Sequence, residues 1–101
     1  MYARVARYEV PQERIEDAVE SFREAAKKVQ ALDGFEDGYV LIDEGGGVLT
    51  MTLWTSRTAL ETSETRASMA RQAAARAVDG EVKSVEEYEV YEQLQPVAEL
   101  T

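Results

Sequence analysis

Apolar and polar side chains alternate most clearly over residues 48–54, in the segment Val-Leu-Thr-Met-Thr-Leu-Trp. A repeat of two residues is typical of a β-strand. The alternation stops at Thr55 and Ser56, whose hydroxyls can accept hydrogen bonds from the free N–H groups of a first helical turn. The pattern therefore predicts a strand that leads directly into a helix, with Trp54, the single Trp of the chain, at the corner. A Trp in this place can form the wall of a pocket or fill a packing site, and both interpretations stay open.

The same kind of pattern predicts the other elements. Alternation and a high content of Val and Tyr predict strands over residues 2–10, 35–43 and 82–94. Between the first two of these strands, apolar residues at helical spacing predict a helix that starts at Pro11 and ends at Asp33-Gly34, with Gly34 as a left-handed cap.

The second helix is predicted to end at Asp79-Gly80 and to be kinked or broken near residues 62–65. Thr62, Ser63 and Thr65 are poor helix formers, and they interrupt an otherwise Ala-rich segment. The three glycines at 45–47 precede a strand, so they predict a hairpin turn and not a phosphate-binding loop.

This order of elements is β-α-β twice, which predicts an α+β fold. The expected architecture is the ferredoxin-like βαββαβ plan, a four-stranded antiparallel sheet with two helices on one face. We expect residues 1–94 to form a single domain and residues 95–101 to form a C-terminal tail.

Helices on one face leave the other face of the sheet uncovered. Leu49, Met51 and Leu53 are expected to share this uncovered face with Val5 of the first strand. An apolar sheet face of this kind is typical of an association surface, and two sheets stacked face to face would bury it. We therefore predict a homodimer with these four residues in its interface.

Composition excludes several classes of function. The chain has no His, Cys or Asn, which excludes a thiolate nucleophile, a Ser-His-Asp triad and a zinc site of the usual nitrogen and sulfur type. We expect no cofactor and no metal, because the acidic residues also lack calcium-loop spacing. A net charge of −9 argues against nucleic acid or an anionic membrane as a partner, and no apolar run has membrane-spanning length. The absence of Cys is compatible with a cytoplasmic protein.

The segment Leu53-Trp54-Thr55-Ser56-Arg57-Thr58-Ala59-Leu60 resembles the strand-Trp-helix segment of the antibiotic biosynthesis monooxygenase (ABM) domain, in the dimeric α/β-barrel superfamily. The resemblance covers about residues 2–94. It implies paired subunits and a ligand pocket between the sheet and the helices. Trp54 is similar to the Trp that lines this pocket, and Tyr39 falls near a Tyr that some oxygenases of the family use.

Two departures from the family narrow the expected activity. Haem-degrading members carry a His on the second helix and an Asn on the first strand, whereas this chain has no His and has Ala6 at the strand position. We therefore do not expect a haem-degrading enzyme with a His ligand. Anthrone-type oxygenases carry an Asn where this chain has Thr50.

Three functions remain compatible with the residues. The first is a homodimer that binds a small apolar or aromatic ligand, or serves only as an assembly module, without catalysis. The alternative is a cofactor-independent monooxygenase that oxidises a phenolic or anthrone-type polyketide substrate with O₂. Other small-molecule chemistry on this fold, such as isomerisation or cyclisation, is a third option.

The candidate site lies between the sheet and the helices, beside Trp54, with the predicted kink of the second helix as its entrance. The ligand-binding candidates are Trp54, Thr50, Thr52, Tyr39 and Tyr8, and the catalytic candidates are Trp54, Tyr39 and Arg4. In the oxygenase hypothesis Trp54 forms an aromatic wall, Arg4 or Arg57 stabilises a phenolate, and a Tyr orients the ring. The structural alternative makes Arg4 a surface partner of nearby acids and Tyr8 a strand-packing residue.

Overall fold

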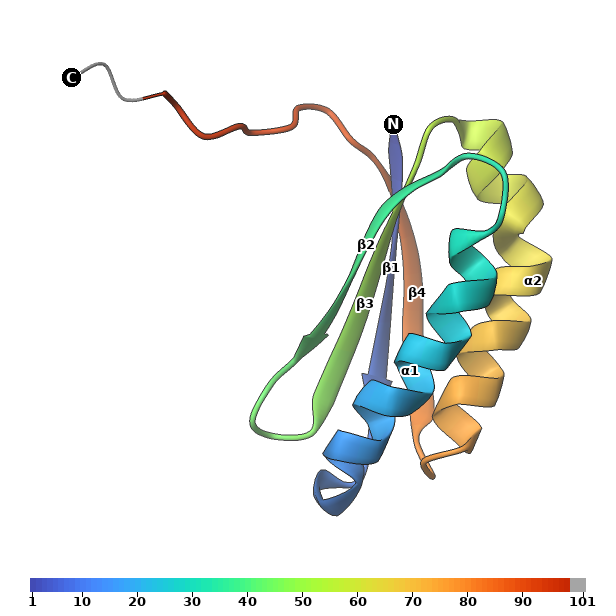
Figure 1. The fold of residues 1–101 in the computed structure, drawn as a ribbon, viewed down its shortest axis with the longest axis vertical. Helices are drawn as coiled ribbons and strands as arrows, with labels where there is room; N and C mark the ends of the chain where they lie inside the picture. The colour runs from blue at the N-terminus through green and yellow to red at the C-terminus, as the bar shows by residue number, and fades with distance from the viewer. Residues whose placement is uncertain (99–101) are drawn as a thin grey trace.

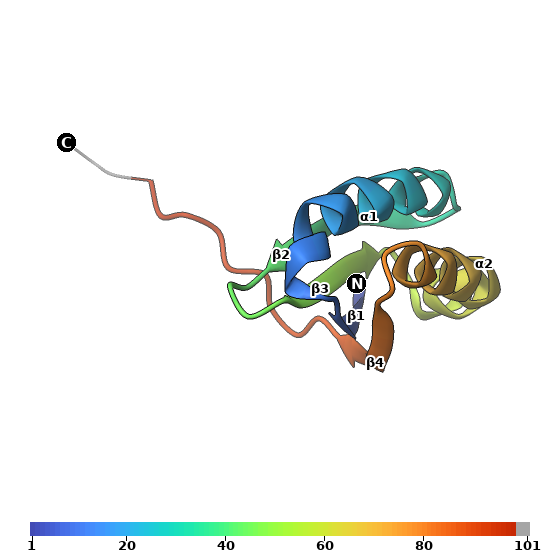
Figure 2. The same ribbon diagram turned by 90° about the horizontal axis from the view of Figure 1, so that it is seen from below.

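The arrangement of strands and helices is that of the predicted ferredoxin-like fold (Figure 1). The computed structural model describes residues 1–98. The elements are β1 (Tyr2–Glu9), a 3₁₀ helix (Gln12–Arg14), α1 (Ile15–Gln30), β2 (Phe35–Ile42), β3 (Gly47–Trp54), α2 (Arg57–Arg76) and β4 (Glu81–Glu89). The strands form one antiparallel sheet in the order β2-β3-β1-β4. Both helices lie on one face of this sheet (Figure 2), so the opposite face, hereafter the open face, has no helix over it.

The pairing of the two central strands confirms the predicted division of residues between the faces. Arg4 is opposite Thr52 and lies on the helix side, where its guanidinium reaches α2. Val5 is opposite Met51. Because successive side chains of a strand point to opposite faces, and Val5 follows Arg4 directly, Val5 lies on the open face. The alternation read from the sequence thus assigns the faces of β1 and β3 correctly.

Helix α2 is continuous from Arg57 to Arg76, so the predicted break near residues 62–65 is wrong. The Ser63 hydroxyl donates to the carbonyl oxygen of Leu60 at 2.8 Å and accepts from Arg4 Nη1 at 3.2 Å. These buried contacts with β1 outweigh the low intrinsic helix propensity of the segment. The predicted cap at the start of α2 is confirmed, because the Ser56 hydroxyl accepts from the backbone N–H of Ala59 at 3.1 Å.

The two Asp-Gly pairs end their helices in different ways. Gly34 has a φ of +84°, and a Cβ at this position would lie 2.3 Å from the Cβ of Ala59, so the left-handed cap and the close approach of α2 both require glycine. After α2 the left-handed residue is Asp79, with a φ of 57°, and not Gly80.

Strand β4 ends at Glu89, five residues before the predicted end of the strand at Leu94. Its neighbour β1 begins at Tyr2, and the last ladder bond runs from the Val90 N–H to the Met1 carbonyl oxygen at 2.8 Å. Beyond this point no strand remains for the chain to pair with, and Tyr91 is 96% exposed. The predicted tail at 95–101 is described as far as residue 98, with no helix or strand, and residues 99–101 lie outside the described part.

The apolar core has two ends. At one end the Tyr8 ring contacts the edge of Phe22, with ring centroids 4.5 Å apart, in a buried cluster that also contains Ala18 and Val48. At the other end Trp54 packs edge-to-face against Phe35, with centroids 5.5 Å apart. No helix in the described residues is long and apolar enough to cross a membrane.

Candidate functional site

A cavity of about 470 Å³ lies between the helices and the sheet. Hereafter it is called the interlayer cavity. Its apolar lining comes from both helices and from β2, and includes Val19, Phe22, Ala26, Phe35, Val40 and Ala67. Its polar lining on the sheet side includes Arg4, Tyr8, Thr50 and Thr52. An apolar concave site with a few convergent polar groups is the usual form of a small-molecule site.

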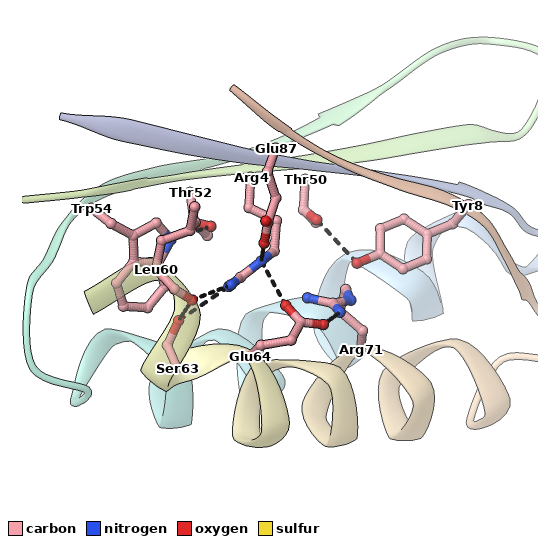
Figure 3. Close-up of polar contacts among 10 residues, drawn as sticks. All are labelled: Arg4, Tyr8, Thr50, Thr52, Trp54, Leu60, Ser63, Glu64, Arg71 and Glu87. Carbon is pink, nitrogen blue, oxygen red and sulfur yellow. Dashed lines mark hydrogen bonds and ion pairs between the residues drawn. The ribbon is translucent and has the colours of Figure 1, made fainter. Parts of the chain in front are cut away.

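Arg4 is a buried cation at one end of this cavity (Figure 3). Only 3% of the residue is exposed, so Arg4 is not the surface partner of nearby acids that the structural alternative made it. Its guanidinium donates to the Ser63 hydroxyl, to the Leu60 carbonyl oxygen and to Glu87 Oε2. Its Nε also lies 2.8 Å from Glu64 Oε2. Burial lowers the pKa of the Arg4 guanidinium, and the carboxylates of Glu64 and Glu87 act in the opposite direction.

A second, largely buried cation, Arg71 of α2, shares the carboxylate of Glu64 with Arg4 (Figure 3). The Arg71 side chain is 11% exposed, lines the cavity, and bonds through Nη2 to Glu64 Oε1. The sequence interpretation missed both Arg71 and Glu64. The sequence did contain a signal for them. Both residues lie on the face of α2 that carries the buried Ala67 and Ala74, so two charged residues interrupt an otherwise Ala-rich face.

The hydroxyls of Tyr8 and Thr50 form a hydrogen-bonded pair at 3.0 Å on the sheet side of the cavity. Burial raises the pKa of the Tyr8 hydroxyl, while the bond to Thr50 and the charge of Arg71 act to lower it. Tyr8 is therefore a protonated group at neutral pH and can donate a hydrogen bond. In Figure 3 the Arg71 guanidinium extends from α2 toward this hydroxyl pair.

Trp54 is fully buried, and it contacts residues that line the cavity. Its indole N–H donates to the Thr52 hydroxyl at 2.9 Å, and the Arg4 guanidinium lies 5.6 Å from its ring centroid, within cation–π range. Phe35 covers it from the β2 side. The indole therefore orients Thr52 and Arg4 and is itself separated from the cavity by the residues around it.

Tyr39 is placed apart from the other candidates. Residue 39 borders the cavity, but it pairs with Met51, so its side chain belongs to the open face. The reason is a bulge between Phe35 and Asp37, since one extra residue in a strand reverses the facing of every residue after it. The Tyr39 hydroxyl donates to Asp37 Oδ2 at 3.2 Å, and this bond raises the pKa of the Tyr39 hydroxyl.

Arg57, the other proposed phenolate partner, also lies outside the cavity. It is exposed at the start of α2, with its guanidinium 5.3 Å from the ring centroid of Tyr2. Within residues 1–98, no three His, Cys, Asp or Glu side chains are grouped as a metal site would require.

The site can thus hold a flat apolar molecule and stabilise negative charge on it. The walls are largely apolar, a phenol and two threonine hydroxyls lie on the sheet side, and the Arg71 guanidinium reaches the cavity from α2. Charge placed in a partly dehydrated cavity acts more strongly than charge in water.

Comparisons with known proteins agree with this architecture. The family model described as antibiotic biosynthesis monooxygenase matches residues 1–77. No match was found among curated proteins. Among solved structures, a proposed antibiotic biosynthesis monooxygenase from Deinococcus radiodurans has a TM-score of 0.76 and 17% identity, over 97% of this chain and 100% of that one.

Two further structures have the same fold. SnoaB, a cofactor-independent oxygenase from Streptomyces nogalater solved as a variant, has a TM-score of 0.73 and 15% identity, over 94% of this chain and 97% of that one. A Mycobacterium tuberculosis protein has a TM-score of 0.71 and 15% identity, over 93% and 98% of the two chains. At these identities the likeness establishes the fold alone.

Proposed function

Because this chain belongs to the antibiotic biosynthesis monooxygenase family, we propose that it binds a small planar aromatic molecule in the interlayer cavity. The observation that carries the proposal is the cavity itself, about 470 Å³ of space with apolar walls and a buried cluster of hydrogen-bonding groups. A core built only for stability is filled by side chains, since a large void forfeits packing energy. The two buried Arg residues beside this space suit a ligand that carries or develops negative charge.

Filling the cavity should abolish binding. Ala26 is half-buried on α1 and lines the cavity, so Ala26→Phe places a ring in the space that a ligand would occupy. We expect the wild-type protein to bind 1,8-dihydroxy-3-methylanthraquinone saturably, with a change in Trp54 fluorescence, and Ala26→Phe to weaken binding at least about tenfold through direct exclusion. Equilibrium dialysis gives the dissociation constants independently of fluorescence.

The matched control for this variant is Lys28→Phe, which adds the same ring to an exposed position of α1 outside the cavity. It should bind as the wild type does. Equal binding by wild type and Ala26→Phe, with both chains folded, would place the ligand elsewhere and refute the proposal.

We propose cofactor-independent oxygenation as the second candidate function. The supporting observation is the Arg71 guanidinium next to the protonated Tyr8 hydroxyl, which together could stabilise a phenolate or enolate. The SnoaB structure, a cofactor-independent oxygenase with the same fold, makes this chemistry worth testing here. An electron-rich anthrone loses a proton to give a carbanion that can reduce O₂. The methylene carbon then forms a bond to one oxygen atom, the second oxygen leaves as water, and the CH₂ group becomes C=O.

A direct test uses 1,8-dihydroxy-9-anthrone and O₂. If the chain is an oxygenase, quinone should form with equimolar O₂ uptake at least about a hundredfold faster than in buffer, the effect that positioned charge typically supplies. Tyr8→Phe should lower the rate, Ala26→Phe should abolish it, and a chelator should change nothing. A rate equal to that in buffer, from a protein that still binds the quinone, would leave the binding function and exclude this activity on anthrones.

We also propose that the chain forms a homodimer through its open face. Val5, Leu49, Met51 and Leu53 lie on this face, and Tyr39 and Leu41 of the edge strand extend it with 49% exposure each. Such a continuous apolar surface without a covering helix suits a second copy of the same sheet. A cytoplasmic location remains a prediction from the Cys-free sequence.

A further inference from the structure

The lining of the interlayer cavity has the opposite charge to the chain as a whole. The protein has 20 acidic and 11 basic residues. Of the described residues that line the cavity, however, Arg4, Arg23, Lys27 and Arg71 are cationic and none is acidic. A lining of this sign favours anionic ligands inside a protein that otherwise repels them.

Three of the four cations already have their partners. Arg4 is surrounded by Ser63, Leu60 and two carboxylates. Arg23 and Lys27 are each 63% exposed and pair along α1, with Glu20 at 3.5 Å and Glu24 at 2.9 Å. These exposed pairs are weak and can rearrange in solvent.

Arg71 differs from the other three. Its side chain is only 11% exposed, yet within residues 1–98 its one hydrogen-bond partner is Glu64, through Nη2. A guanidinium has five N–H donors in a planar fork that matches a carboxylate. The remaining donors of Arg71 lie at the cavity, on the side where Figure 3 shows the Tyr8 hydroxyl.

Arg71 shares its one carboxylate partner with Arg4. Glu64 stands between two buried guanidinium groups, is itself 41% exposed, and its Oε2 accepts no well-aligned hydrogen bond although it lies 2.8 Å from Arg4 Nε. One carboxylate is therefore shared by two largely buried cations. Glu87, the other nearby acid, contacts Arg4 at 3.3 Å and is 43% exposed. Arg71 thus has no carboxylate of its own among the described residues, and most of its donors are left for a ligand.

We infer that the ligand of the interlayer cavity is an aromatic acid whose carboxylate binds to Arg71 and accepts a hydrogen bond from the Tyr8 hydroxyl. The inference rests on the proposed function and specifies its ligand class. The aromatic body lies against Phe22, Val40 and Ala67, and the Thr50 hydroxyl donates to the Tyr8 oxygen, which leaves the Tyr8 hydrogen for the carboxylate. The carboxylate of an aromatic acid is ionised at neutral pH, so Arg71 can recognise it without any prior proton transfer or oxidation of the ligand.

Two ligands of the same shape test this assignment. 1,8-Dihydroxyanthraquinone-3-carboxylate and its 3-methyl counterpart differ only in the charged group. The intact wild-type protein should bind the carboxylate about ten- to a hundredfold more tightly at low salt, as expected for a charge-assisted bond in a partly buried site. Isothermal titration calorimetry or equilibrium dialysis measures both constants, and added salt should reduce the preference.

Variants then identify the protein residue that causes the tighter binding of the carboxylate compound. Arg71→Met should remove the preference, so that the dissociation constants of the carboxylate and of the methyl compound become nearly equal, and Tyr8→Phe should reduce the preference several-fold. Arg71→Lys keeps the charge without the planar fork, so it should retain part of the preference, and it serves as the test if the Met variant does not fold. The matched control is Arg66→Met, on an exposed position of the same helix.

The outcomes separate the two proposals. If the methyl compound binds and the carboxylate binds no better, the inference is overturned and the proposed function stands. If the preference survives in Arg71→Met, the assignment of the anion to Arg71 is wrong. If neither compound binds to the wild-type protein, the proposed function fails and the inference falls with it.

Discussion

Met51→Glu should convert the proposed homodimer to a folded monomer. Met51 is at the middle of the open face, opposite Val5 on one side and Tyr39 on the other. In a twofold interface the substitution occurs twice, and each buried, unpaired carboxylate costs several kcal/mol. A change of that size raises the dissociation constant by several orders of magnitude. In the monomer the same side chain is only partly buried, so the fold itself should tolerate the charge.

The matched control is Met69→Glu, the same substitution at a position of α2 that is 68% exposed. Sedimentation equilibrium at micromolar concentration should give a dimer for the wild type and for Met69→Glu, and a monomer for Met51→Glu. Circular dichroism checks that all three chains are folded. A monomeric wild type, or a dimer that persists in Met51→Glu, would show that the open face is not the interface.

Arg4→Met should have the largest effect on folding stability, with a loss of about 2–4 kcal/mol in the free energy of unfolding. The substitution keeps most of the side-chain volume but removes a buried guanidinium that binds the Leu60 carbonyl, the Ser63 hydroxyl and two carboxylates. Water can solvate Glu87, whose side chain is 43% exposed, whereas the Glu64 Oε2 atom is buried and would lose its cationic neighbour.

Arg7→Met on the same strand is the control for Arg4→Met. Arg7 is 55% exposed and pairs with Glu86 at 3.3 Å, so its loss should cost about 0–1 kcal/mol. Urea unfolding at one fixed protein concentration compares the two variants, since dimerisation would make stability depend on concentration. Adding Glu64→Gln to Arg4→Met should recover part of the loss by removing the carboxylate left behind. Equal losses for the two Arg variants would mean that the buried network contributes little.

Most of the fold could be predicted because its signals are local. The alternation over 48–54, the Ser56 cap and the Gly34 stop each depend on a few neighbouring residues, and each appears in the structure as expected. Strand order then follows from the connections, because two β-α-β units joined by a hairpin leave few arrangements of an antiparallel sheet.

Elements whose state depends on distant partners were predicted less well. The segment 62–65 looks like a helix break from propensity, but the contact of Ser63 with Arg4, far away in the chain, keeps α2 continuous. The end of β4 was placed too late because a strand extends only as far as its neighbour, and β1 has no residue left to pair with Tyr91.

Some features of the candidate site could likewise be predicted from local sequence patterns, and others could not. The sequence by itself determined that Arg4, Thr50 and Thr52 face the helices, because the period of a strand decides this once the central pair is known. Only the tertiary structure decided where Tyr39 lies, since a single-residue bulge after Phe35 reverses the facing of the strand and leaves no strong mark in the sequence. Tertiary structure also decided that Glu64 of α2 stands between Arg4 and Arg71. Charges on separate elements acquire a partner, a degree of burial and a shifted pKa only when packing brings them together and removes the water between them.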